Sequence, residues 1–339
     1  MSCIFGDGFD NYSVISDVYE FTGSDNSIRL NTGQSRTGIG CLQINSAAFG
    51  PTKTFTGIPH VLGCTNWNCN TGGQVLAFSN FLADVGQNAW CVVVAVNLDG
   101  SISITRGPSA SFAVLGTTVA NLYHFNTYNN IACEVVISPS AGVVNLWVNG
   151  ALKLALTNVN TGHANQGVAN ICDGIQLMAP GGIPTCFHDD FYILDCGSTP
   201  NNTFLGALKL YTLAPTANAS VTWTPNAGTN WSNVSEIPPD GDTSFNSSST
   251  VNQVDQYVYP ATGVPAGSSI FFVLHDQDLK IGAAGSRSVG SVINGGAPVN
   301  SQALTSNYHI YQTSRDTSDG INQWTLGNFP LNAGPQVTL

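Results

Sequence analysis

Short apolar runs recur along the chain, and turn dipeptides separate them. The run at residues 91–97 reaches Asp99-Gly100 and continues as the alternating stretch 101–105. This pattern predicts a β-hairpin in which Gly100 supplies the positive φ that the turn needs. No segment shows a sustained period of 3.6 residues, so helices are expected to be short or absent.

A second group of strands is predicted in the middle of the chain. Residues 131–137 and 144–148 form a hairpin pattern, and Asn149-Gly150 then predicts a turn into 151–156. Because successive strand residues point to opposite faces, Trp147 is expected on the face opposite its apolar neighbours.

Composition supports an all-β fold. Glu occurs three times and Lys four times, whereas Gly, Asn, Ser and Thr are abundant. Long charged side chains build exposed helix faces, and small hydroxyl and amide residues favour turns and strands. Hydrophobic residues make up 42% of the chain, which is enough for a packed core.

The cysteines indicate a domain boundary, because all nine precede residue 197. We therefore predict two β-sandwich (jelly-roll) domains in tandem, 1–197 and 198–339. The odd count and dispersed spacing favour buried, reduced thiols. A zinc site or a disulfide at Cys64 and Cys69, beside His60, is the alternative. Strands of the second domain are predicted at 206–213, 220–224, 269–274, 308–313 and 323–326. The uncharged tail 330–339 is expected either to pack on a neighbouring subunit or to be disordered.

The charge balance excludes nucleic acid as a partner, and the length of the apolar runs excludes membrane insertion. Nine Lys and Arg face twenty Asp and Glu, for a formal charge of -11, so no basic surface exists for nucleic acid. The longest apolar run, residues 90–96, is too short to insert into a membrane. The first residues show no secretory signal, so folding in a cytoplasm is expected.

Several motifs resemble a known family. They are the opening FGDGFDNY at 5–12, the glycine-rich 37–44, the Val-Asn-Gly turn at 148–150 and DDFYI at 189–193. Together they resemble a concanavalin A-like (laminin G-like) jelly roll carried by virion proteins of tailed bacteriophages. Residues 204–209, 223–228, 238–243 and 324–325 resemble the continuation found in that phage group.

The resemblance implies a structural protein of the virion, on the tail, baseplate, fibre or head surface. Such a protein acts through contacts with other virion proteins, as a homo-oligomer, and is assembled in the host cytoplasm. The alternative is an adhesin of the virion that binds a host glycan or receptor. No cofactor is expected.

Nothing in the sequence supports an enzyme. Glycosidases of this fold place two Glu within a few residues on one strand, but Glu20, Glu134 and Glu236 are far apart. Asp189 and Asp190 are adjacent, so on a regular strand they point to opposite faces and share a site only if the strand bulges.

Two candidate cation sites remain. His188 and Asp190 fall on one face of a strand, as do Asp276 and Asp278. The spacing of Asp276 and Asp278 suits an oxygen-ligated cation or a glycosidase pair, although a solvated strand end is the simpler interpretation. For His188 and Asp190, a calcium or ligand site is the alternative to structural hydrogen bonding.

Three tryptophans and one amide are candidates for ligand binding. Trp67 lies in a polar stretch predicted to be a loop, Trp147 lies on the outward face of its strand, and Trp231 follows a polar turn. With Asn149 they fit a sugar-binding surface, in which aromatic rings stack on the ligand and amides bind its hydroxyls. The alternative is that these rings complete the core.

Overall fold

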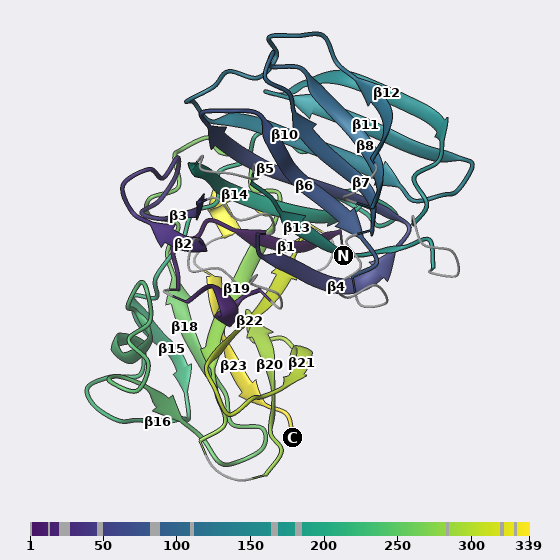
Figure 1. Ribbon diagram of the computed structural model, residues 1–339. Helices are drawn as coiled ribbons and strands as arrows, with labels where there is room; N and C mark the ends of the chain where they lie inside the picture. Colours follow the sequence, from purple (N-terminus) through teal and green to yellow (C-terminus); the bar gives the residue numbers. More distant parts are fainter. Residues whose placement is uncertain are drawn as a thin grey trace. The chain divides into compact units, whose positions relative to one another are not determined.

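The computed structural model describes residues 2–12, 14–19, 28–45, 50–81, 89–108, 112–163, 169–179, 185–282, 285–318, 322–328 and 331–339. These residues form strands and connecting loops, with three single-turn 3₁₀ helices, η1 (Ile15–Asp17), η2 (Trp231–Val234) and η3 (Leu326–Asn328) (Figure 1). The all-β prediction is confirmed. No helix in this described part of the chain has the length and apolarity needed to span a membrane.

The chain forms two compact units. The first comprises residues 1–9 and 19–210, and the second comprises 10–18 and 211–339. These units differ from the predicted ranges 1–197 and 198–339 in two places. Residues 198–210 belong with the first unit, and residues 10–18 belong with the second.

The first unit contains an antiparallel sheet of eight strands. In spatial order these are β12 (Ala151–Val159), β11 (Gly142–Val148), β10 (Asn129–Val136), β5 (His60–Cys69), β14 (Thr185–Asp195), β3 (Cys41–Asn45) and β2 (Ile28–Asn31), and β1 (Cys3–Asp7) also pairs with β14.

A second antiparallel sheet of six strands faces the first. Its order is β4 (Thr52–Ile58), β13 (Cys172–Leu177), β6 (Gly73–Ser79), β7 (Ala89–Val96), β8 (Ile102–Pro108) and β9 (Ala113–Thr117). Gly63 of β5 marks the close approach of the two sheets, because a Cβ there would lie 2.9 Å from Ile175 Cδ1 and 3.2 Å from Phe78 Cζ. The two antiparallel sheets therefore form a β-sandwich.

The locally encoded hairpins are confirmed. β7 pairs with β8 around a turn in which Gly100 has φ 75°. β10, β11 and β12 follow one another across the sheet, and Asn149 and Gly150 at the β11–β12 turn have φ 50° and 84°. All nine cysteines are buried free thiols, as expected.

β14 changes partner along its length. Residues 185–188 pair with β3, and residues 191–194 pair with β1. Between these two halves the register with β5 shifts, and Asp190 adopts φ 48°. A left-handed residue at a register shift is a β-bulge, so this strand does not alternate regularly at Asp189 and Asp190.

The second unit contains a five-stranded antiparallel sheet and two strand pairs. The sheet order is β15 (Ala217–Val221), β18 (Asp255–Tyr259), β23 (Leu331–Val337), β20 (Ser288–Ile293) and β21 (Val299–Ala303). The pairs are β16 (Thr224–Pro225) with β17 (Asn246–Ser247) and β19 (Val273–Leu279) with β22 (His309–Arg315). β19 packs over the sheet, where its Val273 contacts a core that includes Trp324.

Three local predictions in the second half of the chain were wrong. Residues 206–213 form no strand, because side chains of the first sheet hold their backbone, as described below. Residues 323–326 contain one isolated bridge and the start of η3. In the described tail, residues 331–337 form β23, an interior strand of this unit's own sheet.

Candidate functional site

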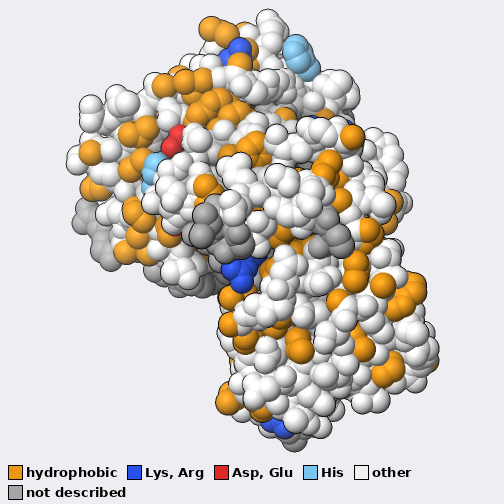
Figure 2. Space-filling model, turned by 180° about the vertical axis from the view of Figure 1, so that it is seen from behind, with side chains coloured by type: hydrophobic (Ala, Val, Ile, Leu, Met, Phe, Trp, Pro, Cys, Tyr) orange, Lys and Arg blue, Asp and Glu red, His pale blue; other side chains and the backbone are white. Residues whose placement is uncertain are grey.

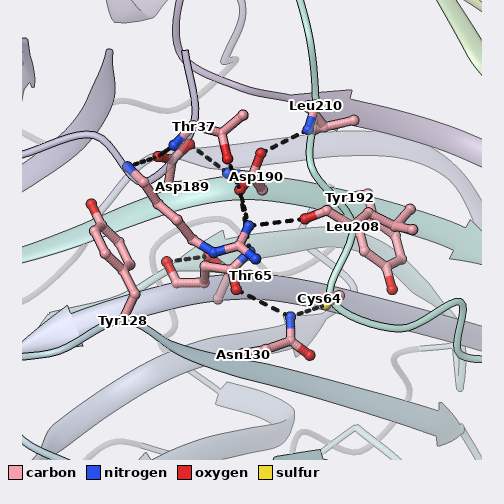
Figure 3. A network of polar contacts seen from close by, with 12 residues as sticks. Thr37, Cys64, Thr65, Tyr128, Asn130, Asp189, Asp190, Tyr192, Leu208 and Leu210 are labelled. Carbon is pink, nitrogen blue, oxygen red and sulfur yellow. Dashed lines mark hydrogen bonds and ion pairs between the residues drawn. The ribbon is translucent and has the colours of Figure 1, made fainter. Parts of the chain in front are cut away.

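The bulge in β14 turns two adjacent carboxylates toward the same loop (Figure 3). Asp189 Oδ2 accepts the backbone N–H groups of Arg36 at 2.5 Å and of Thr37 at 3.1 Å. Asp190 Oδ2 accepts the Arg36 guanidinium and, at 3.0 Å, the Thr37 hydroxyl. Its Oδ1 accepts the N–H of Leu210 at 2.7 Å. The sequence allowed a shared site only with a bulge, and the structure contains that bulge.

These two aspartates are sealed from solvent, since both are 0% exposed. Burial, together with the charge of Asp190, raises the pKa of Asp189 to about 8. Burial also raises the pKa of Asp190, while the Leu210 N–H and Arg36 oppose that rise. Because a substrate or an ion cannot reach these carboxylates, we interpret the pair as structural: it holds residues 36–37 and 208–210 against the sheet.

His188 does not join Asp190, so the predicted pairing of these two residues as metal ligands was wrong. His188 Nε2 lies 2.8 Å from the carbonyl oxygen of Met178, and Nδ1 lies 3.2 Å from Thr65 Oγ1. Burial lowers the pKa of His188 to about 4. The ring is therefore a neutral core group with both nitrogens occupied.

Trp67 is also a core residue, and its predicted place in an exposed loop was wrong. It lies within β5, is 0% exposed, and packs against Tyr123 with ring centroids 5.1 Å apart. Its polar neighbour Asn66 is buried as well, and donates to Asp190 at 3.5 Å. The polar stretch that suggested a loop is a strand whose outward residues are covered.

Trp147 and Asn149 lie on β11 and the turn that follows it. Trp147 faces outward, is half-buried, and stacks on Phe204 with ring centroids 5.1 Å apart and planes at 27°. Asn149 is exposed, but its side chain closes the turn: Oδ1 accepts the Asn130 N–H at 2.9 Å, and Nδ2 donates to Asn129 Oδ1 at 3.1 Å.

A polar row runs beside Trp147 on the same face of the sheet. Asn145 Nδ2 donates to Glu134 Oε2 at 3.0 Å, and Glu134 Oε1 lies 2.7 Å from His60 Nε2. Cys196 lies close enough to complete a group of three metal-ligating side chains with His60 and Glu134. Sequence reasoning missed this row, because only the pairing of β10 with β5 brings Glu134 to His60.

In the second unit, Asp276 and Asp278 share one face of β19, as predicted, but have different surroundings. Asp276 accepts the amides of Asn11 and, at 2.8 Å, of Gln312. Asp278 lines a cavity of about 290 Å³, and burial raises its pKa to about 6. Within the described residues, no group of three metal-ligating side chains includes either aspartate.

Trp231, the remaining aromatic candidate, begins η2. It is half-buried, and its backbone N–H donates to Asn218 Oδ1 at 2.8 Å. The other three candidates, Trp67, Trp147 and Asn149, belong to the first unit.

Another surface feature of the first unit is an apolar strand edge. β12 ends one sheet and β9 ends the other, and the two strands are in contact. Leu152 is 52% exposed and Val114 is 64% exposed on these strands. We call β9 and β12 together the β9–β12 edge. Few charged side chains interrupt the apolar and uncharged polar surface on the face shown in Figure 2.

Comparison with known proteins gives likenesses of fold alone. No family model matches the sequence, and no curated protein matches it. Among solved structures, the carbohydrate-binding module CBM66 of Bacillus subtilis is 9% identical with a TM-score of 0.34, covering 52% of this chain and 99% of that one. The catalytic domain of an endo-1,3-beta-glucanase (laminarinase) of Thermotoga petrophila is 10% identical with a TM-score of 0.36, covering 57% and 97%. A beta-glucanase of Bacillus licheniformis is 14% identical with a TM-score of 0.32, with the same two coverages.

Proposed function

We propose that this protein is a non-catalytic structural component of a tailed-phage virion that acts through protein–protein contacts at its β9–β12 edge. The assignment to a virion, assembled in the host cytoplasm, rests on the sequence resemblance. The contact surface rests on the exposure of Leu152 and Val114 on two strands that end their sheets. An open edge offers unpaired backbone groups to a strand of another subunit, and its apolar side chains gain from losing water.

The partner proposed for this edge is a second copy of the chain, which gives a homo-oligomer with a self-complementary contact. Among the strands that the structure describes, β12 pairs only with β11, and its contact with β9 is not a strand pairing, so its outer edge can pair with an added strand. Lys153 is the one charged residue on this strand, which leaves little repulsion between two copies.

The test is the oligomeric state of the full chain by analytical ultracentrifugation. Leu152→Lys combined with Val114→Lys is expected to convert an oligomer into a monomer, because two charges would be buried at the contact. Leu98→Lys is the matched control, since Leu98 is 79% exposed but lies in the β7–β8 turn. A wild-type chain that stays monomeric, and that mass spectrometry does not find in purified particles, would overturn the proposal.

Glycan binding is the second candidate, and the surroundings of Trp147 favour it. A half-buried indole stacked on Phe204 lies beside the hydrogen-bonded side chains of Asn145 and Glu134. An apolar ring flanked by amide and carboxylate groups suits a sugar, whose faces are apolar and whose edges carry hydroxyls. Trp147→Ala should abolish retention on host cells and on a glycan array, whereas Trp231→Ala in the other unit should not. Absence of wild-type binding to both would exclude this candidate.

The proposal includes no enzymatic activity. The two adjacent aspartates of the first unit are buried and fully engaged, and their role in holding two segments accounts for their contacts. Release of product from host polysaccharide by the purified chain would contradict this part of the proposal.

A further inference from the structure

Three adjacent strands bring His60, Glu134 and Cys196 together on the outward face of the larger sheet. β5 lies between β10 and β14. The register pairs Glu134 with Leu62 and Val136 with His60, so Glu134 and His60 are diagonal neighbours on one face. Cys196 directly follows β14, and its N–H donates to the carbonyl of His60 at 3.0 Å.

The ligand atoms of these side chains are close enough to share one ion. One nitrogen of His60, one carboxylate oxygen of Glu134 and the sulfur of Cys196 all lie within 4.8 Å of one another. In a tetrahedral zinc site, bonds of about 2.0–2.3 Å separate the ligand atoms by about 3–4 Å. Small side-chain rotations reach that geometry once the ion replaces the hydrogen bond between His60 and Glu134.

The group is open on one side and supported on the other. The side chain of His60 is 30% exposed and that of Glu134 is 13% exposed, whereas Cys196 is 5% exposed. An ion therefore enters past the imidazole, and solvent supplies its fourth ligand. Asn145 holds the second oxygen of Glu134 at 3.0 Å, in the way that outer hydrogen bonds orient metal ligands.

We propose that His60, Glu134 and Cys196 form a binding site for one divalent transition-metal ion, with Zn²⁺ as the best match. A neutral imidazole, a carboxylate and a thiolate together carry two negative charges, which balance the ion. Binding releases the thiol proton of Cys196 to solvent as the sulfur–metal bond forms. Thiolate and imidazole select Zn²⁺ over the oxygen-seeking ions Ca²⁺ and Mg²⁺.

This group differs from the one that the sequence alone suggested. Cys64 lies four residues after His60 on the same strand, which separates the two by about 13 Å at the rise of a β-strand. Cys69 is still farther along the strand. Neither thiol can share an ion with His60, so the partners of His60 are Glu134 of β10 and Cys196, which follows β14, and not residues of its own strand.

The test uses the full chain after treatment with a chelator. Titration with Zn²⁺ in a calorimeter is expected to give one ion per chain, and Co²⁺ is expected to produce the absorption band of a cobalt–thiolate bond. His60→Ala and Cys196→Ser should each lose the Zn²⁺ heat, and Cys196→Ser should also lose the Co²⁺ band. Asn145→Ala should bind about tenfold more weakly.

Two controls separate this site from others. His124→Ala removes an exposed histidine elsewhere, and Cys69→Ser removes the thiol of the rejected group; both should bind as the wild type does. Circular dichroism confirms that each variant is folded. If the folded wild type gives neither heat nor a cobalt band, or if both ligand variants keep them, the proposal is overturned.

Discussion

Arg36 and Asp190 form an ion pair that holds three distant parts of the first unit together. The guanidinium of Arg36 donates to Asp190 Oδ2 and also to the carbonyl of Leu208 at 3.0 Å. The side chain of Asp190 is 0% exposed, whereas that of Arg36 is 21% exposed. Arg36 therefore supplies the positive charge that makes a buried carboxylate at the β14 bulge tolerable.

Replacing Arg36 with Ala should lower the free energy of unfolding by about 3–5 kcal/mol, because it leaves Asp190 buried without its counter-charge. Urea unfolding measures the change. Arg287→Ala is the control, since Arg287 is exposed and its guanidinium bonds to the carbonyl of the preceding residue. Equal losses in the two variants would show that the pair with Asp190 contributes nothing.

His188 predicts a loss of stability in acid. Burial lowers its pKa from an ordinary value near 6.5 to about 4. Between these two pH values the unfolded chain therefore binds a proton at His188 and the folded chain does not. Stability should therefore be complete above about pH 6.5 and fall as the pH approaches 4, by about 3 kcal/mol in total.

The variant His188→Gln should weaken this acid dependence, because glutamine can still donate to Met178 but does not titrate. Urea unfolding near pH 7 and near pH 4.5 gives the comparison. His124→Gln, which changes an exposed ring, should keep the wild-type slope. His275, whose pKa burial also lowers to about 4, should leave part of the slope in both variants. An unchanged slope in His188→Gln would contradict the assignment.

The sequence predicted correctly those features in which a strand and its turn are adjacent along the chain. The turns at Gly100 and Asn149-Gly150 were predicted from their dipeptides, and the outward position of Trp147 followed from simple alternation. Each of these features depends on a few consecutive residues, and the structure confirms all of them.

The predictions that were wrong concern features that depend on contacts between residues distant in the sequence. Trp67 was assigned to a loop because polar residues flank it. Asp190 and Tyr192, however, hold residues 206–210 against the sheet, so polar residues beside Trp67 can be buried there. The same contacts explain why residues 206–213 form no strand. His60 and Glu134 are 74 residues apart, so only strand pairing reveals them as neighbours.

Gly334 in β23 should tolerate no side chain. A Cβ at this position would lie 1.7 Å from the carbonyl oxygen of Asp255 in β18, and backbone cannot move aside as a flexible side chain can. Gly334→Ala should cost about 3 kcal/mol or more and destabilise the second unit first. Gly282→Ala is the control, since nothing lies within 4 Å of its added Cβ. Limited proteolysis that cleaves both variants at the same rate would contradict this expectation.

Asp255 is the last residue whose replacement should have a large and specific effect. Its carboxylate is 0% exposed and accepts four hydrogen bonds. Its Oδ1 accepts the backbone N–H groups of Thr222 at 2.7 Å and Trp223 at 2.8 Å. Its Oδ2 accepts the side-chain amide of Asn230 at 2.9 Å and the hydroxyl of Tyr257 at 2.8 Å.

Because all four partners donate, Asp255→Asn must turn an NH₂ group toward donors at one of its two ends. The lost bonds and the buried unsatisfied donors should cost about 2–3 kcal/mol in urea unfolding. Asn230 precedes η2, so the fluorescence of Trp231 should also change in the folded variant. Asp240→Asn, which alters an exposed carboxylate of the same unit, should change neither quantity. Full stability in Asp255→Asn would mean that the hydroxyl of Tyr257 has rotated to accept a bond from the new amide.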